Sequence, residues 1–244
     1  MDRKYQVIVA DPCWSFSDKL TMSDVKRGAA SNYPTMSLTD LKSLPIKEIA
    51  DPEGAILALW VPSSLLQQGL ELMSAYGFQQ KQSYIWVKVK KNIPDLLVKS
   101  TINNIKKYIK DNLLDFTDYI FNYGLKDLLT KSFNFSLQDT LSFGMGRLFR
   151  QTHEICLIGT NNNKIYQQLQ NKSQRSVSFA PNLKHSAKPE HLQDSLELMF
   201  PNANKIEMFA RRLRPGWECL GNEVQNGLDI REALAKLIGA KISQ

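Results

Sequence analysis

Apolar runs of strand length recur along the chain and alternate with segments of helical spacing. Uninterrupted apolar runs are typical of strands buried on both faces of a parallel sheet. These runs cover residues 5–11, 54–61, 83–89, 154–160, 204–209 and 217–223. Apolar residues three or four apart cover 37–44, 63–77, 189–199 and 230–238 and predict helices. The alternation predicts an α/β fold, in which βα units form a largely parallel sheet with helices on both faces.

Capping residues mark the ends of several predicted helices. Ser37, followed by Asp40, is typical of a helix N-cap. Ser63 and Ser64 are expected to cap the helix that ends at Gly77, because glycine is favoured just past a helix C-terminus.

The segment from about residue 90 to 142 interrupts the alternation of strands and helices. Its apolar residues, from Ile102 to Ile120, are spaced three and four apart, which predicts helices in place of a strand. No linker composition divides the rest of the chain. We therefore expect a single domain over residues 1–244 that is interrupted by a helical insertion at about 90–142.

The composition is that of an ordinary globular protein, with 43% hydrophobic and 23% charged residues. No run approaches the roughly 18 uncharged apolar residues that cross a bilayer, and no signal-peptide cleavage pattern precedes the first strand. Cys13, Cys156 and Cys219 are too far apart to suggest a disulfide framework or a metal site. These features predict an intracellular, cytoplasmic protein that is not secreted, has no membrane segment and holds no metal.

The formal net charge of +7 favours a polyanionic partner, because Lys and Arg gain affinity by displacing counterions from phosphates. A nucleic acid is the expected partner of this kind. Arg147 and Arg150 follow a Gly-x-Gly turn and could contact a phosphate backbone, although a solvated face explains them about as well.

The tetrapeptide at residues 11–14 carries the main candidate chemistry. An amino group conjugated with an aromatic ring is a poor nucleophile and needs acceptors that hold it as its geometry changes. Asp11 offers a carboxylate, Pro12 a carbonyl and Trp14 a flat face on which a base can stack. The alternative is a turn at the end of a strand with Trp14 in the core.

Five ordered blocks of the sequence resemble the family of the catalytic subunit of mRNA N(6)-adenosine methyltransferase and its bacterial and phage relatives, which carry a DPPW tetrapeptide. The resemblance covers residues 5–89 and 143–224. The matching blocks are VIVADPCW, NYPTMSL, LALWV with YIWVKV, FGMGRLFRQTHEICLIGT with HSAKPE, and KIEMFARRLRPGWECLGNEV.

The resemblance implies a Rossmann-like methyltransferase sheet and transfer of a methyl group from S-adenosylmethionine to the N(6) amino group of adenine. The polymer is DNA or RNA, and we expect DNA because the chain lacks appended RNA-binding modules. The residues implied as catalytic are Asp11, Pro12 and Trp14. Those implied to bind the cofactor are Lys188, Arg211, Asn222, Glu223 and Asp11, and those implied to bind substrate are Tyr33, Arg147 and Arg150. His185 is a further candidate for contact with cofactor or target.

Two departures from the family pattern leave alternatives open. Cys13 stands in place of the second proline of DPPW, which loosens the loop that a proline would stiffen. The insertion at 90–142 is longer than in relatives and could read nucleic acid, bind a partner, block the site or be a tolerated surface addition. One alternative function is therefore a catalytically silent subunit that binds nucleic acid. With either function the chain could form a homo- or hetero-oligomer. Another is a methyltransferase for a small molecule or a protein, which the tetrapeptide argues against.

Overall fold

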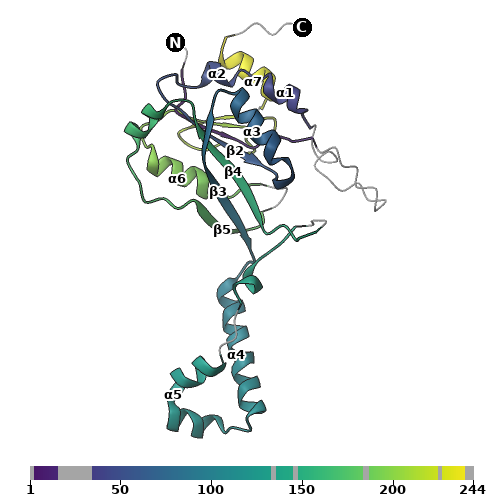
Figure 1. Cartoon of the computed structure of the whole chain (residues 1–244), viewed down its shortest axis with the longest axis vertical. Coiled ribbons are helices and arrows are strands. Elements are labelled where there is room, and N and C mark those ends of the chain that lie inside the picture. The colour runs from purple at the N-terminus through teal and green to yellow at the C-terminus, as the bar shows by residue number, and fades with distance from the viewer. Residues whose placement is uncertain are drawn as a thin grey trace, which may run out of the picture. The chain divides into compact units, whose positions relative to one another are not determined.

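The computed structural model describes residues 3–15, 35–132, 136–144, 148–183, 187–224 and 227–239. The chain divides into two compact units (Figure 1). The first unit comprises Met1–Trp86, Glu154–Ser178 and Ala187–Gln244. The second comprises Val87–His153 and Phe179–Ser186 and contains the predicted insertion.

A seven-stranded sheet organises the fold, with strand order β5-β3-β4-β2-β1-β6-β7. All six predicted strands are present, and β5 is an additional edge strand that the apolar pattern did not indicate. The strands are β1 (Val7–Ala10), β2 (Ile56–Val61), β3 (Gln79–Val89), β4 (His153–Thr160), β5 (Val177–Pro181), β6 (Lys205–Met208) and β7 (Trp217–Leu220).

The sheet is mixed, which corrects the expectation of a largely parallel sheet. β1 pairs in parallel with β2 and with β6, and β6 pairs in parallel with β7. β4 pairs with β2 in the antiparallel direction. The chain between β3 and β4 runs through the second unit. An antiparallel strand needs no crossover packed on the sheet, which agrees with the direction of β4 beside β2.

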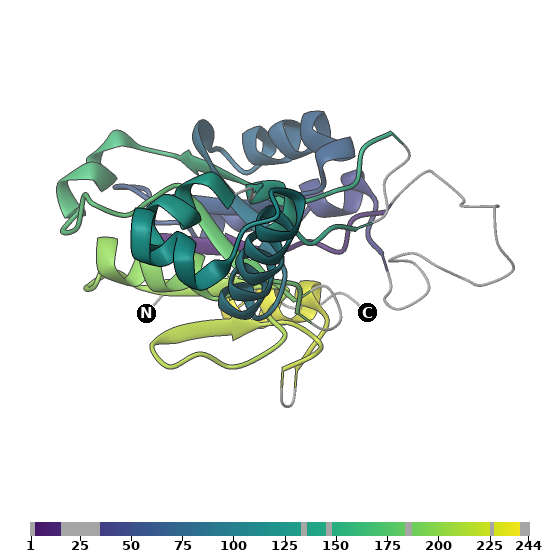
Figure 2. The same cartoon turned by 90° about the horizontal axis from the view of Figure 1, so that it is seen from below.

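Helices cover both faces of the sheet, as predicted. One core cluster joins alternate strand residues, such as Ile8 and Leu57, to side chains of α1 (Leu38–Lys42), α2 (Ile46–Ile49), α3 (Leu66–Ala75) and α7 (Ile230–Leu237). The buried residues of α6 (His191–Met199) lie outside that cluster. In Figure 2, α3 and α6 lie on opposite sides of the sheet.

Local capping accounts for the start of α1 but not for that of α3. The Ser37 side chain accepts from the backbone N–H of Asp40, whose carboxylate accepts from the backbone N–H of Ser37. Ser63 and Ser64 instead belong to the 3₁₀ turn η2 (Ser63–Leu65) and do not cap α3. The caps predicted at these two serines are therefore wrong, because a short turn separates the strand from the helix. A second 3₁₀ segment, η4 (Asn163–Gln168), follows β4.

The second unit is built on two helices, as the spacing predicted. They are α4 (Ile93–Asp111) and α5 (Phe116–Ser132), followed by the 3₁₀ turn η3 (Leu137–Thr140). α5 bends at Gly124, whose φ of 79° lies in the left-handed region that glycine tolerates. Within the described ranges, no helix combines the length and apolar character needed to cross a membrane.

Candidate active site

Polar side chains gather at one edge of the sheet because the strand register brings them there. Ala10 pairs with Met208, and Met208 pairs with Leu220. The residues that follow these three strands, Asp11, Phe209 and Gly221, therefore leave the sheet at the same edge. β4 runs the other way, with Ile155 opposite Val61, so Glu154 at its start belongs to this edge as well.

This edge is also where the sheet changes its direction of winding. From β1 the chain passes to β2 through α1 and α2 on one face, and it reaches β6, on the other side of β1, after α6 on the opposite face. Ligands of open α/β sheets bind outside the carboxyl ends of strands at such a switch point. Asp11 follows the strand at which the switch occurs.

An ionic cluster of three side chains occupies this position. The Lys188 Nζ atom donates to Asp11 Oδ1 at 2.9 Å and Oδ2 at 2.8 Å, and it lies 3.2 Å from Glu154 Oε2. It also lies 5.6 Å from the centroid of the Trp60 ring, within range of a cation–π contact. An ammonium has three N–H donors, so these carboxylates occupy all of them.

The charge of Lys188 is held by its neighbours despite its burial. Its side chain is only 13% exposed. Burial alone disfavours the ammonium, but the Asp11 and Glu154 carboxylates more than offset this, so the pKa of Lys188 is raised above its ordinary value. Burial together with the Asp11 charge also raises the pKa of the nearby Cys156 thiol, which is therefore an unreactive neutral group.

The tetrapeptide forms a tight turn whose indole points into the core. Trp14 is 6% exposed and its Nε1 donates to the Trp60 carbonyl at 3.0 Å. The Pro12 carbonyl accepts from the Trp14 backbone N–H at 2.9 Å and keeps a second lone pair. The Cys13 carbonyl accepts from the Met36 backbone N–H at 2.9 Å, and burial raises the pKa of the Cys13 thiol. In this conformation Trp14 braces the turn, and its role as a stacking platform stays a prediction.

The loops after β6 and β7 bring the predicted ribose-binding residues together. Arg211 Nε lies 3.5 Å from Glu223 Oε1, and Asn222 is exposed beside them. A Cβ at Gly221 would lie 2.3 Å from the carbonyl oxygen of Ala210, so only glycine permits this approach of the two loops.

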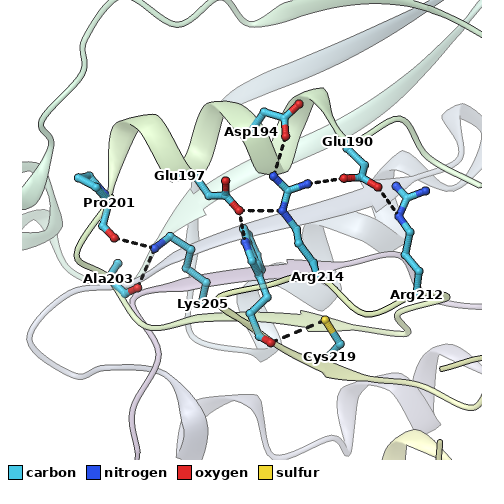
Figure 3. Close-up of polar contacts among 10 residues, drawn as sticks. Glu190, Asp194, Glu197, Pro201, Ala203, Lys205, Arg212, Arg214 and Cys219 are labelled. Carbon is cyan, nitrogen blue, oxygen red and sulfur yellow. Dashed lines mark hydrogen bonds and ion pairs between the residues drawn. The ribbon is translucent and has the colours of Figure 1, made fainter. Parts of the chain in front are cut away.

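A second ionic cluster fastens α6 to the loop between β6 and β7 (Figure 3). The Arg214 guanidinium reaches Glu190 and Asp194 at 2.6 Å and Glu197 at 2.7 Å. Arg212 Nε lies 2.6 Å from Glu190 Oε1, and Arg212 Nη2 donates to the carbonyl of Lys188 at 3.3 Å. These contacts hold the segment that carries Lys188 against the neighbouring loop.

The structure brings together five of the predicted residues at the edge described above, in two groups: Asp11 with Lys188, and Arg211 with Asn222 and Glu223. Arg150 lies in the second unit, where its guanidinium is 5.9 Å from the Phe143 ring centroid. Tyr33, Arg147 and His185 lie outside the described residues. Among those that are described, no group of three or more His, Cys, Asp or Glu could hold a metal ion.

Sequence reasoning missed Glu154, Trp60 and Glu190. Trp60 and Glu154 lie at the end of one strand and the start of another, within runs that were read only as buried strands. The one usable signal was the charge of Glu154 directly before an apolar run, and it gains meaning only when β4 is known to be antiparallel. Glu190, two residues after Lys188, was indistinguishable from a solvated residue in the first turn of a helix.

Comparisons with known proteins point to one family. The sequence model of the family described as MT-A70 matches residues 5–114 and 130–223. The chain is 23% identical over 237 residues to the type II methyltransferase M.MunI of a Mycoplasma species, covering 91% of this chain and 78% of that protein.

The chain covers a much smaller share of its eukaryotic relatives. The chain is 22% identical over 223 residues to an N(6)-adenosine-methyltransferase MT-A70-like protein of Drosophila melanogaster, and 91% of the chain spans 27% of that protein. It is 23% identical over 223 residues to the human N(6)-adenosine-methyltransferase catalytic subunit METTL3, and 91% of the chain spans 28% of that protein.

Proposed function

The chain belongs to the MT-A70 family of methyltransferases, and we propose that it transfers a methyl group from S-adenosylmethionine to the N(6) amino group of adenine in DNA. DNA is preferred because the chain spans most of the type II methyltransferase but only about a quarter of the relatives named for adenosine, the ribonucleoside.

The observation that carries this proposal is the contact of Asp11 with Lys188 at the carboxyl end of β1. It joins the carboxylate of the tetrapeptide to the cation of the segment before α6, within 2.9 Å, at the switch point of the sheet. The Asp11 carboxylate can accept a hydrogen bond from the amino group of adenine. The Lys188 ammonium can pair with the methionine carboxylate of S-adenosylmethionine. The pair therefore supplies one group for the target base and one for the cofactor.

The residues at this edge fit S-adenosylmethionine by their chemistry. Lys188 would hold the methionine carboxylate as a point charge. Arg211, Asn222 and Glu223 would hold the adenosine part, and the carboxylate of Glu223 suits a ribose hydroxyl. When bound, the cofactor supplies a methyl group on a sulfonium, whose carbon–sulfur bond breaks as the new carbon–nitrogen bond forms.

Asp11 and Pro12 would orient the adenine. Each accepts from one N–H of the amino group, which turns the nitrogen lone pair out of conjugation and toward the methyl carbon. Because the base must enter an enclosed site, the target is a single-stranded or extruded adenine.

The test is mass spectrometry of nucleosides from DNA and from RNA incubated with the purified chain and deuterated-methyl cofactor. We expect labelled N(6)-methyladenine in DNA and none with the Asp11→Ala variant, while cofactor binding by that variant is retained because Lys188 remains, with Glu154 still beside it. Label in RNA alone rejects the choice of polymer. Turnover by Asp11→Ala equal to that of the unaltered chain rejects the site.

One observation favours a second function, that of a catalytically silent subunit that binds nucleic acid. Both carboxylate oxygens of Asp11 are engaged by Lys188. If this pair is permanent, Asp11 stays occupied. Nucleic-acid binding without measurable affinity for S-adenosylhomocysteine would support this function over the enzyme.

A further inference from the structure

Positive charge is concentrated in the second unit. Its sequence contains twelve Lys or Arg and six Asp or Glu, a net charge of +6, whereas the whole chain carries +7. The first unit, more than twice as long, is thus nearly neutral. Uneven distribution of this kind marks the electrostatic footprint of a polyanion more specifically than net charge does.

The basic residues of α4 form a stripe along the helix. Lys99, Lys106 and Lys110 are spaced seven and four residues apart, which places them on one face, and all three are exposed. The acidic residues of α4, Asp95 and Asp111, lie at its two ends and leave the middle of this stripe uniformly positive.

Exposed aromatic rings accompany the charge. Seven Phe or Tyr side chains are among the exposed large hydrophobic residues that the structure describes, and all but Tyr166 belong to the second unit. These six rings are Phe116, Phe121, Tyr123, Phe143, Phe149 and Phe179. Phe121 is 89% and Phe149 is 88% exposed, so their faces are free to stack.

We infer that the second unit binds a single-stranded segment of nucleic acid, with the lysines of α4 on its phosphates and the exposed rings against its bases. Basic side chains interleaved with aromatic ones are the shared features of surfaces that hold unpaired strands. A protein partner fits less well, because lysine is depleted in protein interfaces.

The inference deepens the proposed function, on which it rests for the class of ligand. The family match leaves out residues 115–129, which include three of the exposed rings, Phe116, Phe121 and Tyr123. This part of the surface lies outside the family match, whereas the three lysines of α4 and the other three rings lie within it.

The contribution of the lysines is tested by fluorescence anisotropy of a labelled single-stranded oligonucleotide that is titrated with the 244-residue chain over a range of salt concentrations. The test variant combines Lys99→Gln, Lys106→Gln and Lys110→Gln. The matched control combines Lys47→Gln, Lys172→Gln and Lys236→Gln, which removes the same charge from exposed positions of the first unit.

We expect the test variant to bind roughly tenfold or more weakly at 0.1 M salt and to lower the slope of log affinity against log salt by about 2, since each phosphate contact on a single strand contributes about 0.7. The control is expected to stay within about twofold of the unaltered chain. Equal losses for the two variants, or no measurable binding by the unaltered chain, overturn the inference.

Stacking of the exposed rings on bases is tested with the variant Phe121→Ser, and Tyr166→Ser of the first unit is its control. Removing one stacked ring should weaken binding about fivefold or more without changing the salt slope. Light scattering of the same variants tests whether a second copy of the chain covers this surface instead. If Phe121→Ser converts a dimer to a monomer and leaves oligonucleotide affinity unchanged, the surface is a protein interface and the inference is wrong.

These measurements do not depend on methyl transfer. Loss of binding in the lysine variant, with no labelled adenine from any polymer, keeps the inference and rejects the proposed function. Full methylation and unchanged binding by that variant reject the inference alone.

Discussion

The ammonium of Lys188 lies within 2.9 Å of both carboxylate oxygens of Asp11, 177 residues away in the sequence. The pair is largely buried, with side-chain exposures of 13% and 21%, and a second carboxylate, Glu154, shares the same cation. The three charged groups stabilise the fold only together, because removing the cation leaves two carboxylates that are poorly solvated and have no opposite charge.

We therefore predict that Lys188→Met lowers the free energy of unfolding by about 3 kcal/mol. The matched control is Lys42→Met, which breaks the exposed ion pair with Glu71 and should cost less than about 1 kcal/mol. Urea denaturation of both variants measures the difference. Equal costs would mean that the Asp11 and Glu154 carboxylates are solvated well enough to need no partner.

A second prediction concerns the close approach of the loops that carry Arg211 and Asn222. In Gly221→Ala, the new Cβ would lie 2.3 Å from the carbonyl oxygen of Ala210, so the two loops must separate. We expect affinity for S-adenosylhomocysteine to fall at least tenfold, as measured by isothermal titration calorimetry. Gly144→Ala is the control, because its Cβ would meet its nearest neighbour at 3.9 Å. Unchanged affinity in Gly221→Ala would remove these loops from the cofactor site.

The two central strands β1 and β2 were predictable because a strand that is buried on both faces is an uninterrupted apolar run, whereas the largely exposed edge strand β5 was not. β1 and β2 are fully buried apolar runs, and the sequence predicted both. The direction of β4 was not predictable, because an apolar run has the same composition whichever way it is traversed. That one unknown hid Glu154, whose place in the ionic cluster depends on the strand entering the sheet from this edge.

The candidate site was predictable as a set of residues but not as a set of contacts. The resemblance implied one site for Asp11 and Lys188, but only the fold shows the ion pair between them. The orientation of Trp14 depends on what the surrounding core accepts, and a sequence does not display this. The indole is placed by its hydrogen bond to the Trp60 carbonyl, a contact that no spacing rule announces.

A third prediction concerns Arg214, which serves three carboxylates of the α6 segment. Its side chain is 12% exposed, and Arg214→Met would leave Glu190, Asp194 and Glu197 without their shared cation. We expect a loss of about 2 kcal/mol in the free energy of unfolding, discounted because the acids are partly solvated. Arg214→Lys should restore little, since one ammonium lacks the planar fork that reaches three partners.

Arg212→Met is the control for this measurement. The Arg212 side chain is 44% exposed, and it pairs with a single carboxylate, that of Glu190, in the part of the chain that the structure describes. Its cost should stay below about 1 kcal/mol. Full rescue by Arg214→Lys in a urea titration would show that net charge, and not the geometry of the guanidinium, holds α6.

The last prediction uses two glutamates whose pKa values move in opposite directions. Burial raises the pKa of Glu207 above its ordinary 4.5, whereas the hydrogen bond from Arg214 lowers that of Glu197.

As pH rises above about 4.5, Glu207 ionises in the unfolded chain before it does in the folded one, so the stability it contributes falls until its folded pKa is passed. Glu197 binds fewer protons when folded, so the stability it contributes is present above about pH 4.5 and is lost as pH falls through its lowered pKa. Urea titrations of Glu207→Gln and Glu197→Gln between about pH 3 and 7 should therefore give differences from the unaltered chain that change with opposite slopes. A difference for Glu207→Gln that does not change with pH would mean that Glu207 is solvated in the folded protein, and a slope of the same sign as that of Glu197→Gln would mean that its pKa is lowered on folding.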